Sequence, residues 1–338
     1  ELQILPETEF KQLVKYSFPE EVIQSSEAPD ETLKPDEAIF YPVTAYPQDS
    51  SVYTISPDGS YILFGFDRVP IYRHSYFARW EVCETASLTC RDLTDTREAN
   101  IRHIQWSPEN KLSFVRDNNL WVVTDVTGSI QNNTVQVTQD GEYAMILNGA
   151  SDWAYEEEVF ESAKANYWSP GSNHLAYVKF EEQIVPLYNF SVYHTNSSYP
   201  ELYTYKYPCA GERSSIVSLW VYNLETTETM QIPLPEDPEQ YISYITWSNE
   251  ETVSFQVLNR IQQEQKLFRY ALETSESTLV TTQRDAKWID PYYKFYPIRG
   301  GNQLIVMQPR DGYKHFVVID SAGNEIADLN DGEPYDVE

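Results

Sequence analysis

Three consecutive acidic residues, Glu156, Glu157 and Glu158, lie inside the segment SDWAYEEEVFESAKANYW at residues 151–168. Apolar residues recur at helical spacing through this segment, and Ser151 or Asp152 is available as an N-cap, so the sequence predicts a short helix near residues 152–163. Neighbouring helical residues point in different directions, so two of the carboxylates could reach one cation from two sides. A unit charge pair at about 4 Å is worth on the order of 4 kcal/mol at an effective dielectric near 20, enough to hold an ammonium group strongly.

The same three acids have a structural interpretation. Carboxylates near a helix N-terminus stabilise the helix by about 0.3–1 kcal/mol each, whatever else they do. Composition alone favours this second interpretation, and the residues by themselves leave both open.

The rest of the chain predicts the scaffold that must position this segment. Tyr, Trp and Phe occur 26, 8 and 14 times in 338 residues, which is typical of half-buried strands. A strand that ends in a Ser-Pro or equivalent turn, followed by a second alternating strand, recurs through the chain. The copies are YTISPDGSYILFGFD at 53–67, IQWSPENKLSFVRDNNLWVVTD at 104–125, YWSPGSNHLAYVKF at 167–180, ITWSNEETVSFQVLNR at 245–260 and FYPIRGGNQLIVMQPRDGYKHFVVID at 295–320.

Such a repeat predicts an all-β fold, a β-propeller built from four-stranded antiparallel blades. We expect the aromatic residue before each turn serine to pack between neighbouring blades. The predicted blades occupy residues 46–338 and do not complete a ring, and residues 1–45 are predicted to be a separate acidic N-terminal arm rich in Pro.

Charge and cysteine content limit the classes of function. The formal net charge of −28 argues against nucleic acid as a partner, because a phosphate backbone repels such a surface. Cys83 and Cys90 flank ETASLT, a predicted hairpin turn that would bring them within bridging distance. Cys209 would then be left over, either free or paired with a cysteine outside this chain. Three acceptor triplets, at Asn132, Asn189 and Asn196, agree with a secretory route and N-glycosylation.

The string D-W-x-Y-E-E-E-V-F at 152–160 resembles the segment with which the dipeptidyl peptidase IV family, a group of prolyl oligopeptidase-type serine peptidases, holds the free N-terminus of a substrate. The resemblance implies that Glu157 and Glu158 bind the α-ammonium and that Glu156 is structural. RHSY at 73–76 also matches that family, which implies that Arg73 hydrogen-bonds a carbonyl of the bound peptide. KWIDPYYKFYP at 287–297 aligns in place with a loop that supplies an aromatic to outer subsites, which makes Tyr292 a substrate contact.

Members of this family carry their Ser nucleophile in a G-x-S-x-G turn on an α/β-hydrolase domain. None of the twelve glycines forms that pattern, so we expect the catalytic domain, with its Ser, Asp and His, to be absent from this chain. The sequence also has no H-E-x-x-H, no C-x-x-C and no glycine-rich phosphate loop, so neither a metal nor a cofactor is expected.

The resemblance therefore predicts the substrate-gating propeller of a serine dipeptidyl aminopeptidase that releases X-Pro or X-Ala dipeptides from peptides with a free N-terminus. A hydrolase domain or chain would complete the active site, and the sequence leaves a homodimer open. The alternative is a catalytically silent relative that serves as an accessory or binding protein. We expect a secreted protein or one at the extracellular face of a membrane, where a type II anchor would lie outside this chain.

Overall fold

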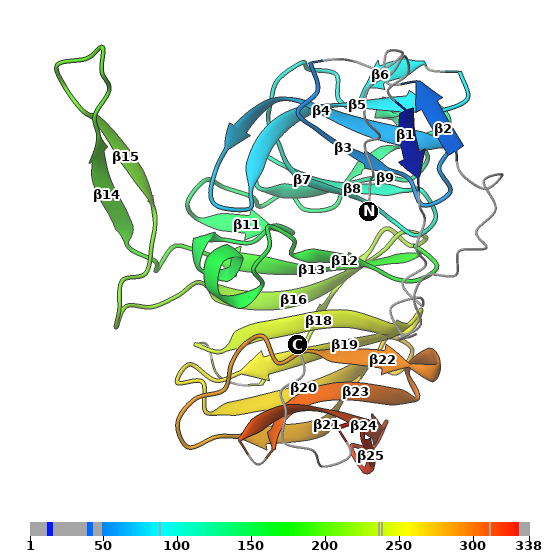
Figure 1. Cartoon of the computed structure of the whole chain (residues 1–338), viewed down its shortest axis with the longest axis vertical. Helices are drawn as coiled ribbons and strands as arrows, with labels where there is room; N and C mark the ends of the chain where they lie inside the picture. The colour runs from blue at the N-terminus through cyan, green and yellow to red at the C-terminus, as the bar shows by residue number, and fades with distance from the viewer. Residues whose placement is uncertain are drawn as a thin grey trace.

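The chain forms antiparallel β-sheets that follow one another as the blades of a β-propeller (Figure 1). The structure is a computed structural model that describes residues 49–87, 89–235, 237, 239–310 and 312–330, together with the backbone of a strand pair, β1 (Gln12–Lys15) and β2 (Ile39–Pro42). The predicted all-β class and the four-stranded blades are confirmed. The acidic arm predicted at residues 1–45 lies outside the described residues apart from that strand pair.

The first two blades are joined into one eight-stranded sheet. The strands of the first are β3 (Val52–Ile55), β4 (Tyr61–Pro70), β5 (Tyr76–Glu84) and β6 (Cys90–Asp92). Those of the second are β7 (Ile101–Trp106), β8 (Leu112–Arg116), β9 (Asn119–Val123) and β10 (Thr134–Gln136), the last preceded by the 3₁₀ turn η4 (Gln131–Asn133). The junction is a short pairing of β5 with β7, where Phe77 lies opposite Arg102.

The third blade carries two insertions. Its strands are β11 (Ile146–Asn148), β12 (Asn166–Trp168), β13 (His174–Glu181), β16 (Ile216–Asn223) and β17 (Thr229–Ile232). A helical turn, η5 (Tyr155–Val159), lies between β11 and β12. Between β13 and β16 the chain leaves the blade as a projecting hairpin, β14 (Leu187–Val192) and β15 (Glu201–Lys206) (Figure 1).

The last two blades are regular. The fourth contains β18 (Tyr241–Asn249), β19 (Thr252–Leu258), β20 (Glu264–Ala271) and β21 (Glu276–Arg284). The fifth contains β22 (Phe295–Ile298), the 3₁₀ turn η6 (Arg299–Gly301), β23 (Gln303–Arg310), β24 (Tyr313–Asp320) and β25 (Glu325–Asp328). In Figure 1 the blades follow chain order from the first at the top to the fourth and fifth, which overlap in this view, at the bottom.

Tryptophans that precede the turn serines join successive blades. The indole N–H of Trp168 donates to Ser113 Oγ of the second blade at 3.0 Å, and that of Trp247 donates to the Tyr167 carbonyl of the third blade at 2.8 Å. Trp106 makes the equivalent but longer contact, 3.5 Å, to the Thr54 carbonyl of the first blade. The predicted packing of these aromatics between blades is confirmed, and each ring buries apolar area while its polar edge finds a partner.

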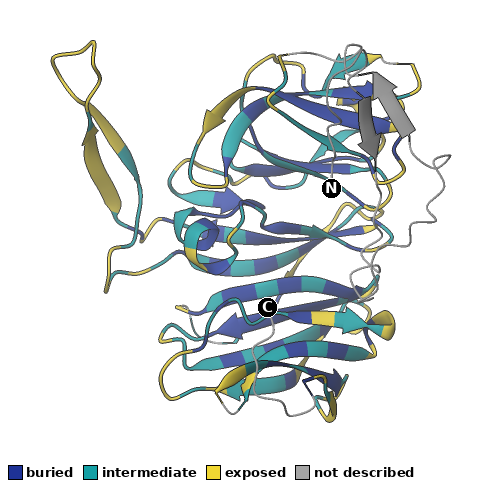
Figure 2. Ribbon diagram, viewed as in Figure 1, coloured by how far each residue is buried: buried dark blue, intermediate teal, exposed yellow. Residues whose placement is uncertain are grey.

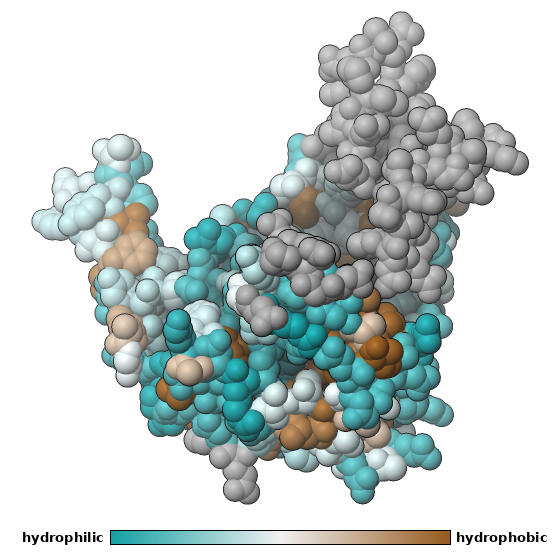
Figure 3. All heavy atoms as spheres, turned by 60° about the horizontal axis from the view of Figure 1, so that its bottom comes forward, coloured by the Kyte–Doolittle hydropathy of each residue, from teal (hydrophilic) through white to brown (hydrophobic). Residues whose placement is uncertain are grey.

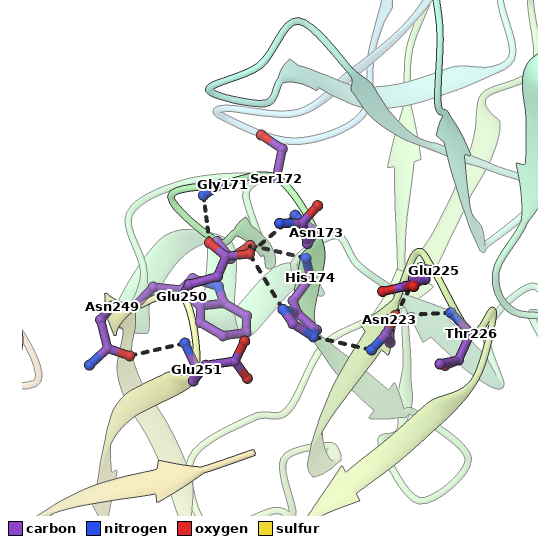
Figure 4. A network of polar contacts seen from close by, with 12 residues as sticks. Gly171, Ser172, Asn173, His174, Asn223, Glu225, Thr226, Asn249, Glu250 and Glu251 are labelled. Atoms are coloured by element: carbon purple, nitrogen blue, oxygen red, sulfur yellow. Dashed lines mark hydrogen bonds and ion pairs between the residues drawn. The ribbon is translucent and has the colours of Figure 1, made fainter. Parts of the chain in front are cut away.

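A carboxylate links the third and fourth blades at the turns themselves (Figure 4). Glu250, in the β18–β19 turn, accepts hydrogen bonds from the Ser169 hydroxyl at 2.8 Å and the Gly171 amide at 2.5 Å. His174 lies 3.5 Å from the same carboxylate, and its ring stacks on Trp247. The Ser-Pro turn of one blade is therefore held by the next blade, so the repeat motif that builds each blade also fixes the contact between blades.

The predicted disulfide is present. Cys83 and Cys90 lie directly opposite each other on β5 and β6 and are bonded, because the ETASLT turn folds the two strands into a hairpin. Cys209 is free and exposed. No helix among the described residues has the length and apolarity needed to cross a membrane.

Candidate functional site

The helical turn η5 is tightly anchored to the propeller core. Asp152 Oδ1 accepts the Tyr155 N–H at 2.8 Å, so Asp152 rather than Ser151 caps the helical segment, which begins at Trp153 and continues into η5. The Tyr155 ring is fully buried, packs edge-on against Phe180, and its hydroxyl accepts the Ile242 N–H of the fourth blade at 3.0 Å. One large side chain thus fixes the acidic turn against two blades.

The turn is shorter and wider than the helix predicted at residues 152–163. The Phe160 N–H bonds to the Tyr155 carbonyl at 2.7 Å, which is the wider spacing of a π-type turn. Glu161 adopts a positive φ of 51°, and Ser151 and Ala163 then pair through their backbones. This return of the chain to the sheet ends the helix after Val159.

Glu156 faces inward and connects the turn to the loop of Arg73. Its side chain is fully buried, and one carboxylate oxygen accepts the backbone N–H groups of His74 and Ser75 at 2.6 and 2.8 Å. The loop lies at the tip of the β4–β5 hairpin, which reaches from the first blade toward η5 (Figure 1). Two segments more than 80 residues apart are thereby joined by charge-assisted hydrogen bonds, which accords with the structural role expected for Glu156.

Arg73 and Glu157 meet directly. The Arg73 Nε donates to one oxygen of Glu157 at 2.9 Å, and an Nη lies 2.7 Å from the other, a bidentate arrangement. The hydrogen bond and the negative charge of Glu157 raise the pKa of the Arg73 guanidinium. The Arg73 side chain is 69% exposed and that of Glu157 only 23%, so the unused donors of Arg73 remain open to a ligand.

Glu158 lines a cavity of about 390 Å³ whose wall also includes Tyr292. The walls are formed by the helical turn, the 207–214 segment, the fourth blade and the 288–292 loop, and they include Trp153, Tyr207 and Trp288. Among the described residues, the Glu158 carboxylate has no hydrogen-bond or ion-pair partner. Burial, together with the nearby charges of Glu161 and Glu158, raises the pKa of Tyr292 to about 12, so its hydroxyl stays protonated.

The structure therefore brings together all four predicted substrate contacts. Arg73 is paired with Glu157, and Glu158 and Tyr292 line the neighbouring cavity. The negative charge of Glu158 also helps to raise the pKa of the Arg73 guanidinium, so Glu158 lies close to the Arg73–Glu157 pair. Within the described ranges, no cluster of His, Cys, Asp or Glu is arranged to hold a metal ion.

A buried group of charges beneath the turn was not expected from the sequence. Arg102, Asp152 and Glu182 are all buried there. Burial raises the pKa of Asp152, although the Ser215 hydroxyl and the Tyr155 amide stabilise its charged form, and burial raises the pKa of Glu182 to about 7. The only sequence signal for this group was a charged residue, Arg102, in an otherwise strand-like IRHIQW segment.

Comparison with known proteins identifies the family. The model of the dipeptidyl peptidase IV N-terminal region matches residues 56–337 of this chain. The chain belongs to the dipeptidyl peptidase IV family. The dipeptidyl peptidase 4 of Felis catus is 32% identical over 286 residues, which is 78% of this chain, and that of Trichophyton tonsurans is 28% identical over 295 residues, which is 83% of it.

A solved structure agrees with this assignment. The crystal structure of Porphyromonas gingivalis dipeptidyl peptidase 4 superposes with a TM-score of 0.77 at 30% identity and covers 86% of this chain. The chain spans 41% of that protein, and 36% and 37% of the cat and Trichophyton tonsurans dipeptidyl peptidase 4 chains. The part of our chain that matches these dipeptidyl peptidase IV family members is the N-terminal propeller. This propeller contains the acidic turn and the Arg73 loop.

Proposed function

We propose that this chain is the substrate-gating propeller of a serine dipeptidyl aminopeptidase that releases X-Pro or X-Ala dipeptides. The observation that supports this most strongly is the cluster of Arg73, Glu157 and Glu158 on one helical turn and one hairpin tip. Glu157 and Glu158 anchor the α-ammonium of the substrate, and Arg73 donates to a backbone carbonyl of the first two residues. The attack on the following peptide bond belongs to a hydrolase domain or chain outside these residues.

The free and bound states differ in the partners of Glu157. In the structure Arg73 neutralises Glu157, whereas Glu158 has no counter-ion among the described residues. The ammonium group of a substrate that binds between Glu157 and Glu158 adds the missing positive charge. It need not displace Arg73, because a carboxylate can accept several hydrogen bonds. Anchoring the N-terminus of the substrate fixes how far the substrate peptide extends toward the nucleophile. This distance sets the length of the released product.

The test is cleavage of a chromogenic Gly-Pro amide by the longer protein that contains this chain. We expect kcat/KM to fall at least about 100-fold when the substrate amine is acetylated, because charge-assisted hydrogen bonds are replaced by an uncharged amide. Equal cleavage of the free and acetylated substrates would contradict the anchoring role. No cleavage of either by the intact assembly would favour the alternative, a catalytically silent accessory or binding protein.

We also propose an extracellular or secreted location. Asn132, Asn189 and Asn196 are all exposed, so each predicted glycosylation site is accessible to modification. The Cys83–Cys90 disulfide supports the same compartment, because such bonds persist in oxidising surroundings.

A second copy of the chain is the partner that we propose for the projecting hairpin, β14 and β15. Figure 2 shows the hairpin as largely exposed, and Figure 3 shows it standing away from the body with apolar side chains along it. The exposed apolar residues of the hairpin and its tip are Leu187, Tyr188, Phe190, Tyr193, Tyr199, Leu202 and Tyr203. Such a surface on a soluble body is typical of an interface.

A further inference from the structure

Arg102 lies where strand β7 is irregular. The pairing of β7 with β8 shifts between Arg102 and Ile104, and His103, between them, has a φ of 47°. An extra residue of this kind is a β-bulge, which bends a strand and changes the direction of its side chains. His103 is half-buried with its Nε2 atom enclosed, and desolvation lowers the pKa of its imidazole to about 3, so the bulge adds no second positive charge. Of the two basic residues at the bulge, Arg102 and His103, only Arg102 carries a charge beneath the helical turn.

The guanidinium of Arg102 contacts both halves of the site. One Nη donates to the Ser151 carbonyl at 2.5 Å, immediately before the acidic turn, and lies 4.0 Å from Oε2 of Glu156. The same group lies over the ring of Tyr72, 5.7 Å from its centroid, at the base of the Arg73 loop. Arg102 therefore touches the helical turn on one side and the hairpin tip on the other.

Arg102 is also the counter-charge for a buried group of acids. Glu156 Oε2 is buried without a hydrogen bond, and Asp152 and Glu182 are both stabilised in their charged forms by Arg102. Lys206 acts on Glu182 as well, but it is not among the charges that stabilise Asp152 most. Unpaired buried carboxylates are costly, so this cation has a clear electrostatic role.

We propose that Arg102 is a positioning residue for the N-terminus anchor. It fixes the distance between the Arg73 loop and the helical turn that carries the two acids. It does so through its contacts with Glu156, Ser151 and Tyr72, and it does not contact the substrate. This inference rests on the proposed function, since the separation matters only if an ammonium group binds there. Loss of Arg102 should weaken substrate binding more than it slows the bond-breaking step, because the acids remain present but are less well ordered.

The experiment compares Arg102→Met, Arg102→Lys and a control, Arg116→Met, in the longer protein. Arg116 lies on the neighbouring strand β8 opposite Ile101, and its guanidinium packs on Trp121 and pairs with Asp95. For a Gly-Pro amide we expect Arg102→Met to raise KM about tenfold with kcat within about twofold of the unmodified protein. Arg102→Lys should raise KM about threefold, because it keeps the charge but not the planar fork of donors. Arg116→Met should leave both constants unchanged.

Hydrogen exchange provides a readout that does not depend on activity. The amides of His74 and Ser75 donate to Glu156, so in Arg102→Met we expect exchange in residues 72–76 to be at least about fivefold faster, with β19 unchanged. An unchanged exchange rate would overturn the inference, as would a loss of folded protein with a normal KM. The proposed function fails if the unmodified protein does not cleave the amide, or if Glu157→Gln leaves KM unchanged. In either case the exchange rates still test whether Arg102 positions the Arg73 loop.

Discussion

Replacing Glu157 and Glu158 together with Gln is expected to lower kcat/KM of the longer protein for a Gly-Pro amide by roughly 100- to 10,000-fold. Each carboxylate would contribute a charge-assisted hydrogen bond to the ammonium, worth about 1.5–3 kcal/mol. Glutamine keeps the size of each side chain but removes the charge. The decrease in kcat/KM therefore measures how much the two negative charges contribute to binding the ammonium group. Steady-state kinetics with the free and acetylated substrates would measure it.

The two single substitutions separate the roles of the acids. Glu158→Gln leaves the Arg73–Glu157 pair intact, so its effect reports the ammonium contact alone. Glu157→Gln also weakens the hold on Arg73 and should have the larger effect. A matched control is Glu273→Gln with Glu276→Gln, two exposed acids at the β20–β21 turn of the fourth blade. If the control lowers kcat/KM as much as the site variants do, general loss of negative charge and not anchoring is responsible.

The second large effect concerns stability. We expect Tyr155→Ala to lower the free energy of unfolding by about 3–5 kcal/mol, because it removes a fully buried ring packed against Phe160 and Phe180. Tyr155→Phe should cost about 1–2 kcal/mol, since the Ile242 amide then loses its acceptor. Urea unfolding monitored by tryptophan fluorescence would measure both.

A control for this prediction is Tyr199→Ala, at the exposed tip of the projecting hairpin. It should change the free energy of unfolding by less than about 0.5 kcal/mol. A cost below about 1 kcal/mol for Tyr155→Ala would mean that the acidic turn is not anchored through this side chain.

The blades were predictable because their signals are local. Ser107 and Ser169 stand at turns whose Pro and preceding Trp fix the backbone and the contact between blades, and the strands after them alternate in the expected way. Cys83 and Cys90 could be paired for the same reason, since only the six residues of the ETASLT turn separate them. Features set by short-range geometry can be derived from the sequence.

The details of the site depend on long-range contacts and were less predictable. Spacing predicted an α-helix, but the buried ring of Tyr155 and the return of the chain at Glu161 impose a shorter π-type turn. The bulge at His103, which directs Arg102 beneath the site, has no signature in the sequence. The substrate-binding roles proposed for Glu157, Glu158, Arg73 and Tyr292 come from the family resemblance, and the structure adds that Arg73 pairs with Glu157 and that Glu158 and Tyr292 line one cavity.

The most direct measurement is a crystal structure of the protein with a bound tripeptide that has a free N-terminus and proline as its second residue. We expect the terminal nitrogen to lie about 3 Å from a carboxylate oxygen of Glu157 and of Glu158, and Arg73 to donate to a peptide carbonyl. A terminal nitrogen in bulk solvent, or one bound elsewhere on the propeller, would contradict it.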